Sequence, residues 1–232
     1  MDRPGNVGWG NDPVTVLIVD DHAAFAEALL VALELEDGLT PAGSAATVDA
    51  ALAHLEREVP DVILMDIDMP GVDGLEGTRM IKQRHPQVHV LLLTGYTDPR
   101  FVELGADAGA VGFLPKQTPI AEIIRAIRTA SEGEMLVPAS MLATVMRRPP
   151  PEQRSTGRYA TLTERELEVL TRLGNGKDAR DIGKALSIEL STVRGHIKSL
   201  LRKLDAHSQL EAVVIAARSG LIDMGPGPKH GS

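Results

Sequence analysis

Short runs of apolar residues alternate along the chain with longer segments in which apolar residues recur at helical spacing. The apolar runs cover 14–19, 39–44, 62–65, 88–93 and 110–114, and the helical segments cover 22–36, 46–57, 74–84, 97–108 and 118–131. Apolar runs separated by helices are typical of parallel strands that are buried on both faces. The pattern therefore predicts an α/β domain over 14–131, built on a five-stranded, doubly wound parallel sheet.

The pattern after residue 160 is entirely helical. Helices are expected at about 163–173, 178–186, 191–204 and 208–219, with a tight turn between the second and the third. Such an arrangement predicts a small all-α helix-turn-helix domain of four helices over 161–222. The third helix places basic side chains opposite its apolar stripe and has no acidic residue. That distribution suits insertion into a major groove of DNA. The last helix could form a dimer contact or pack against the helix-turn-helix core.

A linker is predicted over 132–160, because three consecutive prolines within 147–158 exclude a helix interior. The balance of basic and acidic residues also changes at this linker. Residues 1–160 carry 13 Lys and Arg against 23 Asp and Glu, whereas residues 161–232 carry 11 against 9. The formal charge of −8 for the whole chain thus hides a slightly basic second domain and does not exclude a DNA-binding protein.

Composition excludes several classes of protein. The chain has no cysteine, which removes disulfide scaffolds, cysteine-ligated zinc and thiol catalysis. Its apolar fraction of 43% is enough to form folded cores. Because no apolar run reaches the roughly 18–20 residues of a membrane span, we expect a cytoplasmic protein with no membrane partner.

Polar residues follow the ends of the predicted strands. Asp20, Asp21, Asp66, Thr94 and Lys116 each stand at or just past the end of an apolar run. The carboxyl ends of parallel strands share one edge of the sheet, so these side chains should converge. Clustered carboxylates repel one another unless a cation joins them, and oxygen ligands suit Mg²⁺. An aspartate beside Mg²⁺, a lysine and a hydroxyl is a phosphoryl-accepting nucleophile.

These residues carry a family resemblance. The pair Asp20-Asp21, the segment Val62-Ile-Leu-Met-Asp66-Ile-Asp-Met-Pro-Gly71, the pair Leu93-Thr94 and the segment Gly112-Phe-Leu-Pro-Lys116 together resemble a response-regulator receiver domain. The resemblance implies a flavodoxin-like fold with phosphorylation at Asp66. It implies Mg²⁺ held by Asp20, Asp21, Asp66 and the backbone carbonyl of Asp68. Thr94 and Phe113 match the family's switch pair, and Lys116, which ends the last matching segment, should neutralise the oxygens of the transferred group. The only catalysis implied is phosphoryl transfer to and from Asp66.

The second domain carries a further resemblance. Leu162-Thr-Glu-Arg-Glu166, together with Thr192-Val-Arg-Gly-His196 and the residues after it, looks like a LuxR-type DNA-binding domain. The whole chain is thus similar to a NarL/FixJ-type response regulator. By position, Arg194, Gly195 and Lys198 should read the groove, and Arg180, Thr192 and Lys203 should contact phosphates. The resemblance implies a histidine kinase and double-stranded DNA as partners and a homodimer as the active form, and it leaves RNA polymerase open as a partner.

Two other functions compete with this interpretation. One is a regulator of the same architecture that binds DNA without phosphorylation. The other is a Mg²⁺-dependent phosphatase, because Asp66-Ile-Asp68 resembles the DxD of haloacid-dehalogenase-type enzymes; Pro70 stands where those carry threonine. The helix at 97–108 is a further feature of interest. Gly105 weakens it, since glycine in a helix interior costs about 1 kcal/mol relative to alanine, and we expect it to shift on phosphorylation.

Overall fold

The first domain is a five-stranded parallel sheet with helices on both faces. The computed structural model describes residues 12–95, 100–138, 142 and 162–222. The strands are β1 (Val14–Val19), β2 (Leu39–Ala45), β3 (Val62–Asp66), β4 (His89–Thr94) and β5 (Gly112–Pro115), in the order β2-β1-β3-β4-β5. All four neighbouring pairs are parallel. The predicted fold class is confirmed, including the strand at 39–44, which extends by one residue.

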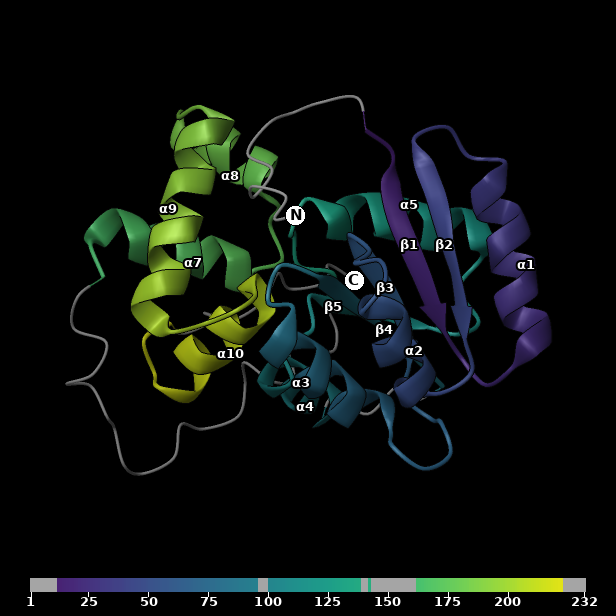
Figure 1. The fold of residues 1–232 in the computed structure, drawn as a ribbon. Helices are drawn as coiled ribbons and strands as arrows, with labels where there is room; N and C mark the ends of the chain where they lie inside the picture. Colours follow the sequence, from purple (N-terminus) through teal and green to yellow (C-terminus); the bar gives the residue numbers. More distant parts are fainter. Residues whose placement is uncertain (1–11, 96–99, 139–141, 143–161, 223–232) are drawn as a thin grey trace, which may run out of the picture.

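The helices divide between the two faces of the sheet (Figure 1). Helices α1 (Ala23–Glu34) and α5 (Ile120–Ser131) cover one face, and α2 (Val48–Leu55), α3 (Gly74–Arg84) and α4 (Arg100–Asp107) cover the other. Alternate strand residues enter opposite cores: Ile18 packs with Leu29 and Ile127, while Leu17 faces α2 and α3. This two-sided burial explains the continuous apolar runs. The first residues of the helix predicted at 97–108 lie outside the described part of the chain.

Both edge strands of the sheet, β5 and β2, depart from regular strand pairing. At the β5 edge, the Phe113 amide donates to the Leu136 carbonyl at 2.7 Å, and the Leu136 amide donates to the Val111 carbonyl at 3.1 Å. In β2, Pro41 still pairs with Val16, but the register with β1 then shifts between Val16 and Leu17, so that Leu17 pairs with Gly43. Residues 132–138, which fall within the predicted linker at 132–160, are therefore folded against the receiver; 139–141 and 143–161 lie outside the described residues.

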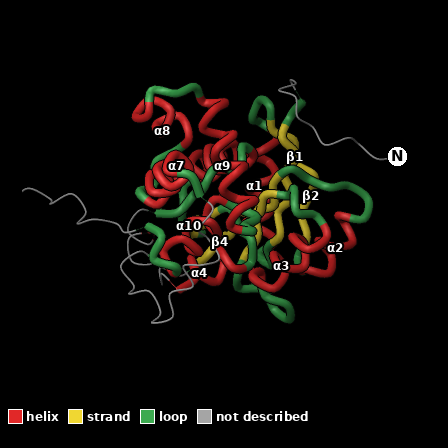
Figure 2. Tube along the Cα trace, turned by 90° about the vertical axis from the view of Figure 1, so that its left-hand side faces the viewer, coloured by secondary structure: helices red, strands yellow, loops and turns green. Residues whose placement is uncertain are grey.

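The second domain contains four described helices (Figure 2). They are α7 (Glu164–Gly174), α8 (Ala179–Leu186), α9 (Leu190–Leu204) and α10 (Gln209–Arg218). Thr163 and Glu166 form the capping box at the start of α7. Ser187 ends α8 with a φ of 52°, and this left-handed residue makes the tight turn into α9. In the residues that the structure covers, no helix is both long and apolar enough to span a membrane.

Helix α10 packs in two directions at once. Ala212, Val213 and Ala216 belong to the helix-turn-helix core, whereas Leu210 and Val214 join the receiver core beside α4. Figures 1 and 2 both show α10 lying beside α4. Arg218 reinforces this contact: its guanidinium lies 2.7 Å from Asp107 and 3.1 Å from Glu103. Helix α10 thus packs against the helix-turn-helix core, one of the two roles left open by the sequence, and it adds a contact with the first domain; its role as a dimer contact stays a prediction.

Candidate functional site

The predicted site residues converge at the carboxyl edge of the sheet. Asp66 is the last residue of β3 and Thr94 the last of β4, while Asp20 and Lys116 follow β1 and β5 directly. The Asp20 amide donates to the Ala45 carbonyl at 3.0 Å, and the Lys116 amide donates to the Thr94 carbonyl at 2.9 Å. Backbone pairing therefore continues past the strands and fixes where these side chains begin. Asp20, Asp66 and Thr94 are buried.

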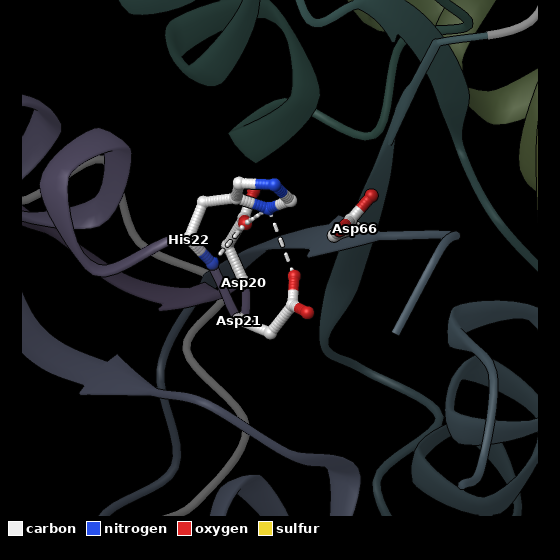
Figure 3. Close-up of side chains that lie close together, drawn as sticks. All are labelled: Asp20, Asp21, His22 and Asp66. Atoms are coloured by element: carbon white, nitrogen blue, oxygen red, sulfur yellow. Dashed lines mark hydrogen bonds and ion pairs between the residues drawn. The ribbon is translucent and has the colours of Figure 1, made fainter. Parts of the chain in front are cut away.

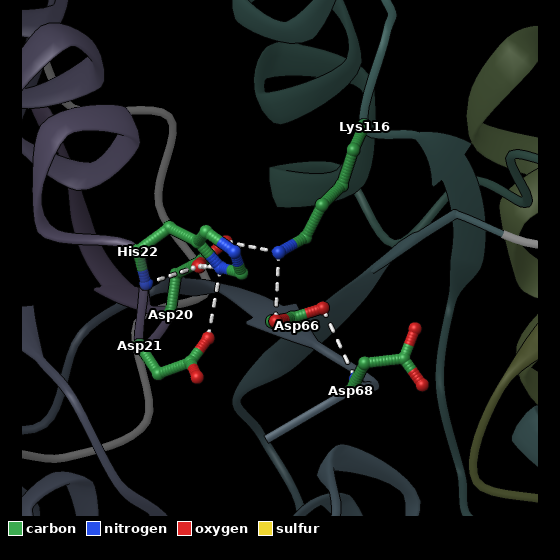
Figure 4. Close-up of polar contacts among 6 residues, drawn as sticks. All are labelled: Asp20, Asp21, His22, Asp66, Asp68 and Lys116. Carbon is green, nitrogen blue, oxygen red and sulfur yellow. Dashed lines mark hydrogen bonds and ion pairs between the residues drawn. The ribbon is translucent and has the colours of Figure 1, made fainter. Parts of the chain in front are cut away.

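Lys116 joins the two buried aspartates. Its Nζ lies 2.7 Å from Asp66 Oδ2 and 2.9 Å from Asp20 Oδ2 (Figure 4). Burial alone would lower the pKa of Lys116, but hydrogen bonding and charge from Asp66 and Asp20 outweigh it and raise the pKa above its usual value. Lys116 therefore carries its positive charge at neutral pH, beside the Asp66 carboxylate.

Two residues that the sequence analysis did not assign also line this site. The Nδ1 atom of His22 lies 2.9 Å from Asp21 Oδ1 and 3.2 Å from Asp20 Oδ1 (Figure 3). The ring of Phe25 lies below Lys116, with Nζ 5.8 Å from the ring centroid, within the range of a cation–π contact. Adjacency of His22 to the aspartate pair was the available sequence signal for its position at the site.

The acidic pocket fits a divalent cation. Ligand atoms of Asp20, Asp21, His22 and Asp66 lie within 4.8 Å of one another. Asp20 Oδ2 and Asp66 Oδ2 are buried, and both face the Lys116 ammonium. Each carboxylate oxygen can accept more than one partner, so these two retain capacity for a metal. A predominantly oxygen donor set suits a hard cation such as Mg²⁺.

Asp68 contributes through its backbone. Its amide donates to Asp66 Oδ1 at 3.1 Å, while its side chain points away from Asp20 and Asp21 (Figure 4). This hydrogen bond orients the Asp66 carboxylate and leaves Oδ2 directed toward Lys116. The assignment of the Asp68 carbonyl as a metal ligand stays a prediction.

Phe113, the predicted switch residue, lies inside the domain. Its side chain is 1% exposed and packs under α4. A Cβ atom added at Gly105 would overlap the Phe113 ring and approach Leu92 Cδ1 to 2.8 Å. Gly105, which we had considered only as a weak point in the helix, thus provides the space that the ring occupies. The switch roles of Phe113 and Thr94 stay predictions.

The predicted DNA contacts divide into two groups. Thr192, Gly195 and Lys198 are exposed on α9, and Arg180 is exposed on α8. Arg194 and Lys203 are instead engaged within the protein. Arg194 Nη2 lies 2.6 Å from Glu132 Oε2, and Lys203 Nζ lies 2.7 Å from Glu166 Oε2. Exposure of Thr192, Gly195 and Lys198 is compatible with contact to DNA. Arg194 and Lys203, and also Arg180 with its 3.8 Å ion pair to Glu132, would have to exchange partners.

The fold and this pocket define a class of protein, the two-component response regulators. Residues 16–128 match the response regulator receiver domain, and residues 160–216 match the bacterial regulatory proteins of the luxR family. The chain belongs to the response regulators that join a receiver domain to a LuxR-type DNA-binding domain.

Relatives of known name share nearly the whole length of the chain. The transcriptional regulatory protein LiaR of Bacillus subtilis is 34% identical over 90% of this chain and 100% of its own. The transcriptional activator protein ExaE of Pseudomonas putida is 35% identical over 89% of this chain and 97% of its own. Among solved structures, the receiver domain of NarL from Mycobacterium tuberculosis is 32% identical, with a TM-score of 0.51, over 53% of this chain and 99% of its own.

Proposed function

We propose that this chain regulates transcription by binding specific DNA sequences, under the control of phosphorylation of Asp66 by a histidine kinase. The observation that carries the proposal is the Lys116 ammonium placed 2.7 Å from Asp66 in an acidic pocket, in a chain that also has a LuxR-type domain. A regulator of this kind acts where the chromosome is, in the cytoplasm. Contact with RNA polymerase would follow if it activates transcription.

The phosphoryl transfer is a nucleophilic displacement at phosphorus. An Asp66 carboxylate oxygen attacks the phosphorus of the kinase phosphohistidine; the new P–O bond forms as the P–N bond breaks, and the leaving imidazole takes up a proton. Lys116 offsets negative charge on the phosphoryl oxygens, and the Thr94 hydroxyl donates to one of them. Mg²⁺, held by Asp20, Asp21, Asp66 and the Asp68 carbonyl, would supply further charge neutralisation when bound.

DNA binding is assigned to α9 and to the helix before it. Inserted in the major groove, α9 would direct Arg194, Gly195 and Lys198 toward base edges, while Arg180, Thr192 and Lys203 would contact phosphates. Helix-turn-helix proteins read paired half-sites, so we propose that the phosphorylated chain binds as a homodimer. The slightly basic second domain supports this requirement, because a single copy supplies little net positive charge.

Intact-mass measurement after incubation with acetyl phosphate and Mg²⁺ tests the phosphorylation step. We expect one phosphoryl group per chain, none in Asp66→Asn, and normal labelling in Asp49→Asn, an exposed aspartate on α2. Continuous hydrolysis of a small phosphate ester, lost in Asp66→Asn, would instead identify a phosphatase.

Selection of bound fragments from genomic DNA tests the second step. We expect recurrent sites to be enriched by the phosphorylated chain and to be far weaker without phosphorylation. Equal enrichment with Asp66→Asn would show DNA binding that does not need phosphorylation. No enrichment under either condition would contradict the DNA-binding assignment.

A further inference from the structure

The segment that follows α5 brings two receiver carboxylates to the DNA-binding domain. Glu132 is the C-cap residue of α5, and Glu134 lies two residues later, before Leu136 pairs with β5. The Glu132 carboxylate lies 2.6 Å from Arg194 and 3.8 Å from Arg180. These are two of the cations assigned to DNA, one on each helix of the helix-turn-helix.

Glu134 occupies a third position of the same kind. Its carboxylate is 8% exposed and accepts a hydrogen bond from the backbone amide of Ala179, the first residue of α8. The amino-terminal end of a helix carries partial positive charge and unpaired amides, which favour an anionic partner. Burial, together with the nearby charges of Asp178 and Glu132, raises the pKa of Glu134 above its usual value.

The three contacts have one property in common. Each places a carboxylate of the receiver against a group that would otherwise bind an anion: the Arg194 guanidinium, the Arg180 guanidinium and the start of α8. Resting on the DNA-binding function proposed above, we infer that Glu132 and Glu134 occupy anion-binding positions on the DNA-contacting face of the helix-turn-helix and compete with DNA for them. On DNA, Arg180 and the Ala179 amide would hold backbone phosphates, and Arg194, assigned above to a base edge at a specific site, would meet a phosphate where the sequence is not specific.

Charge and position both support this competition. The Glu132 carboxylate lies 2.6 Å from Arg194, so a DNA group that contacts this guanidinium must approach a negative charge, and the repulsion opposes simultaneous binding. The acidic excess of the chain lies in residues 1–160, which makes the receiver a polyanionic partner as DNA is. Glu132 is attached to the receiver by α5, so a movement of α5 or of the following segment changes its hold on both arginines.

Glu132→Gln in the full-length chain tests the inference. The probe is a fluorescein-labelled duplex of about 30 base pairs and mixed sequence, because phosphate contacts do not depend on sequence. For the unphosphorylated chain we expect affinity to rise about 5-fold or more, at the lower end of typical coupling between two sites. The control is Glu122→Gln on α5, which removes the same charge from an exposed pair with Arg125. Equal affinity of the two variants would overturn the inference.

A double-mutant cycle separates competition for Arg194 from a general loss of negative charge. Arg194→Gln should weaken DNA binding, and in that background Glu132→Gln should lose most of its gain. The dependence of affinity on salt should also steepen in Glu132→Gln, by about 1 in the log–log slope for each phosphate contact released. A gain that persists undiminished without Arg194 would contradict the inference.

The inference and the proposed function fail in different ways. If the phosphorylated wild-type chain binds DNA while Glu132→Gln behaves as Glu122→Gln does, only the inference is wrong. If neither the phosphorylated wild type nor any variant binds a duplex, the proposed function is wrong as well. Circular dichroism of each variant establishes that the comparison is between folded proteins.

Discussion

Nζ of Lys203 lies 2.7 Å from Oε2 of Glu166, so an ion pair joins the end of α9 to the start of α7. Glu166 is 4% exposed and also accepts the Thr163 amide at 2.7 Å within the capping box. Burial alone would raise the pKa of Glu166, but the hydrogen bonds from Lys203, Thr163 and Ser199 lower it to about 2. Lys203, which we assign to DNA contact, thereby also stabilises the second domain.

Glu166→Gln should destabilise the second domain by about 1–3 kcal/mol at neutral pH, since the Lys203 ammonium loses a charged partner. A carboxylate with a lowered pKa stabilises the fold above its unfolded pKa of about 4.5, and this contribution is lost as the pH falls toward 2. Thermal unfolding of wild type and variant should therefore differ most above pH 4.5 and converge below it. A difference that stays constant down to pH 3 would contradict the assignment. Glu164→Gln, at an exposed glutamate in the first turn of α7, is the matched control and should change little.

Lys116→Gln should lower the rate of phosphorylation by acetyl phosphate about 10²-fold, as removal of one transition-state donor commonly does. The reason is the loss of the positive charge 2.7 Å from Asp66 Oδ2. Rates are measured by intact mass over time at saturating Mg²⁺. Lys198→Gln, which removes a similar charge far from the pocket on α9, should leave the rate unchanged. Equal rates in the two variants would show that Lys116 does not act on the phosphoryl group.

Asp21→Asn should weaken Mg²⁺ binding at least about 10-fold, because a charged oxygen ligand is replaced by a neutral one. Asp68→Asn serves as the control, since the Asp68 side chain points away from the pocket and only its backbone is assigned to the metal (Figure 4). Isothermal titration calorimetry of the full chain measures both affinities. If Asp68→Asn weakens binding as much as Asp21→Asn does, the ligand assignment is wrong.

Gly105→Ala should destabilise the receiver, although alanine is the better helix former. The added methyl overlaps the Phe113 ring, and overpacking of a core costs about 1–3 kcal/mol, more than the roughly 1 kcal/mol gained in helix propensity. Gly195→Ala on α9 is the matched test, because its Cβ would meet nothing within 4 Å and the helix should gain stability. Denaturant unfolding should give opposite signs for the two variants. Replacing Phe113 with leucine should relieve the cost at Gly105 alone.

The sequence predicted the elements and the acidic pocket well because both rest on local signals. Each apolar run identified a strand buried on both faces, and a parallel sheet brings the strand ends to one edge, so Asp20, Asp66 and Lys116 could be placed together before the structure was known. The capping box of Thr163 and Glu166 likewise identified the start of α7. Helix ends shifted by one or two residues, as at Glu34, where α1 ends two residues before the predicted end, because caps and fraying are set by local hydrogen bonds.

The contacts that the sequence did not predict join residues far apart in the chain. Glu132 and Arg194 are separated by 62 positions, and Arg218 and Asp107 by 111. Nothing in the local pattern distinguishes these surface charges from solvated ones, because their pairing depends on how the domains dock. The fit of the Phe113 ring into the space left by Gly105 depends on tertiary packing, which the local pattern does not show. Whether Leu210 of α10 joins the core of the first or the second domain is likewise not evident from its apolar side chain.

The two modified edges of the receiver sheet limit how copies of this chain can associate. At one edge Leu136 already pairs with β5, and at the other Pro41 offers no amide and the β-bulge twists the ladder. An added strand from another molecule would find no regular row of donors and acceptors at either side. We therefore expect any association between copies of this chain to use helix surfaces and not strand pairing at these edges.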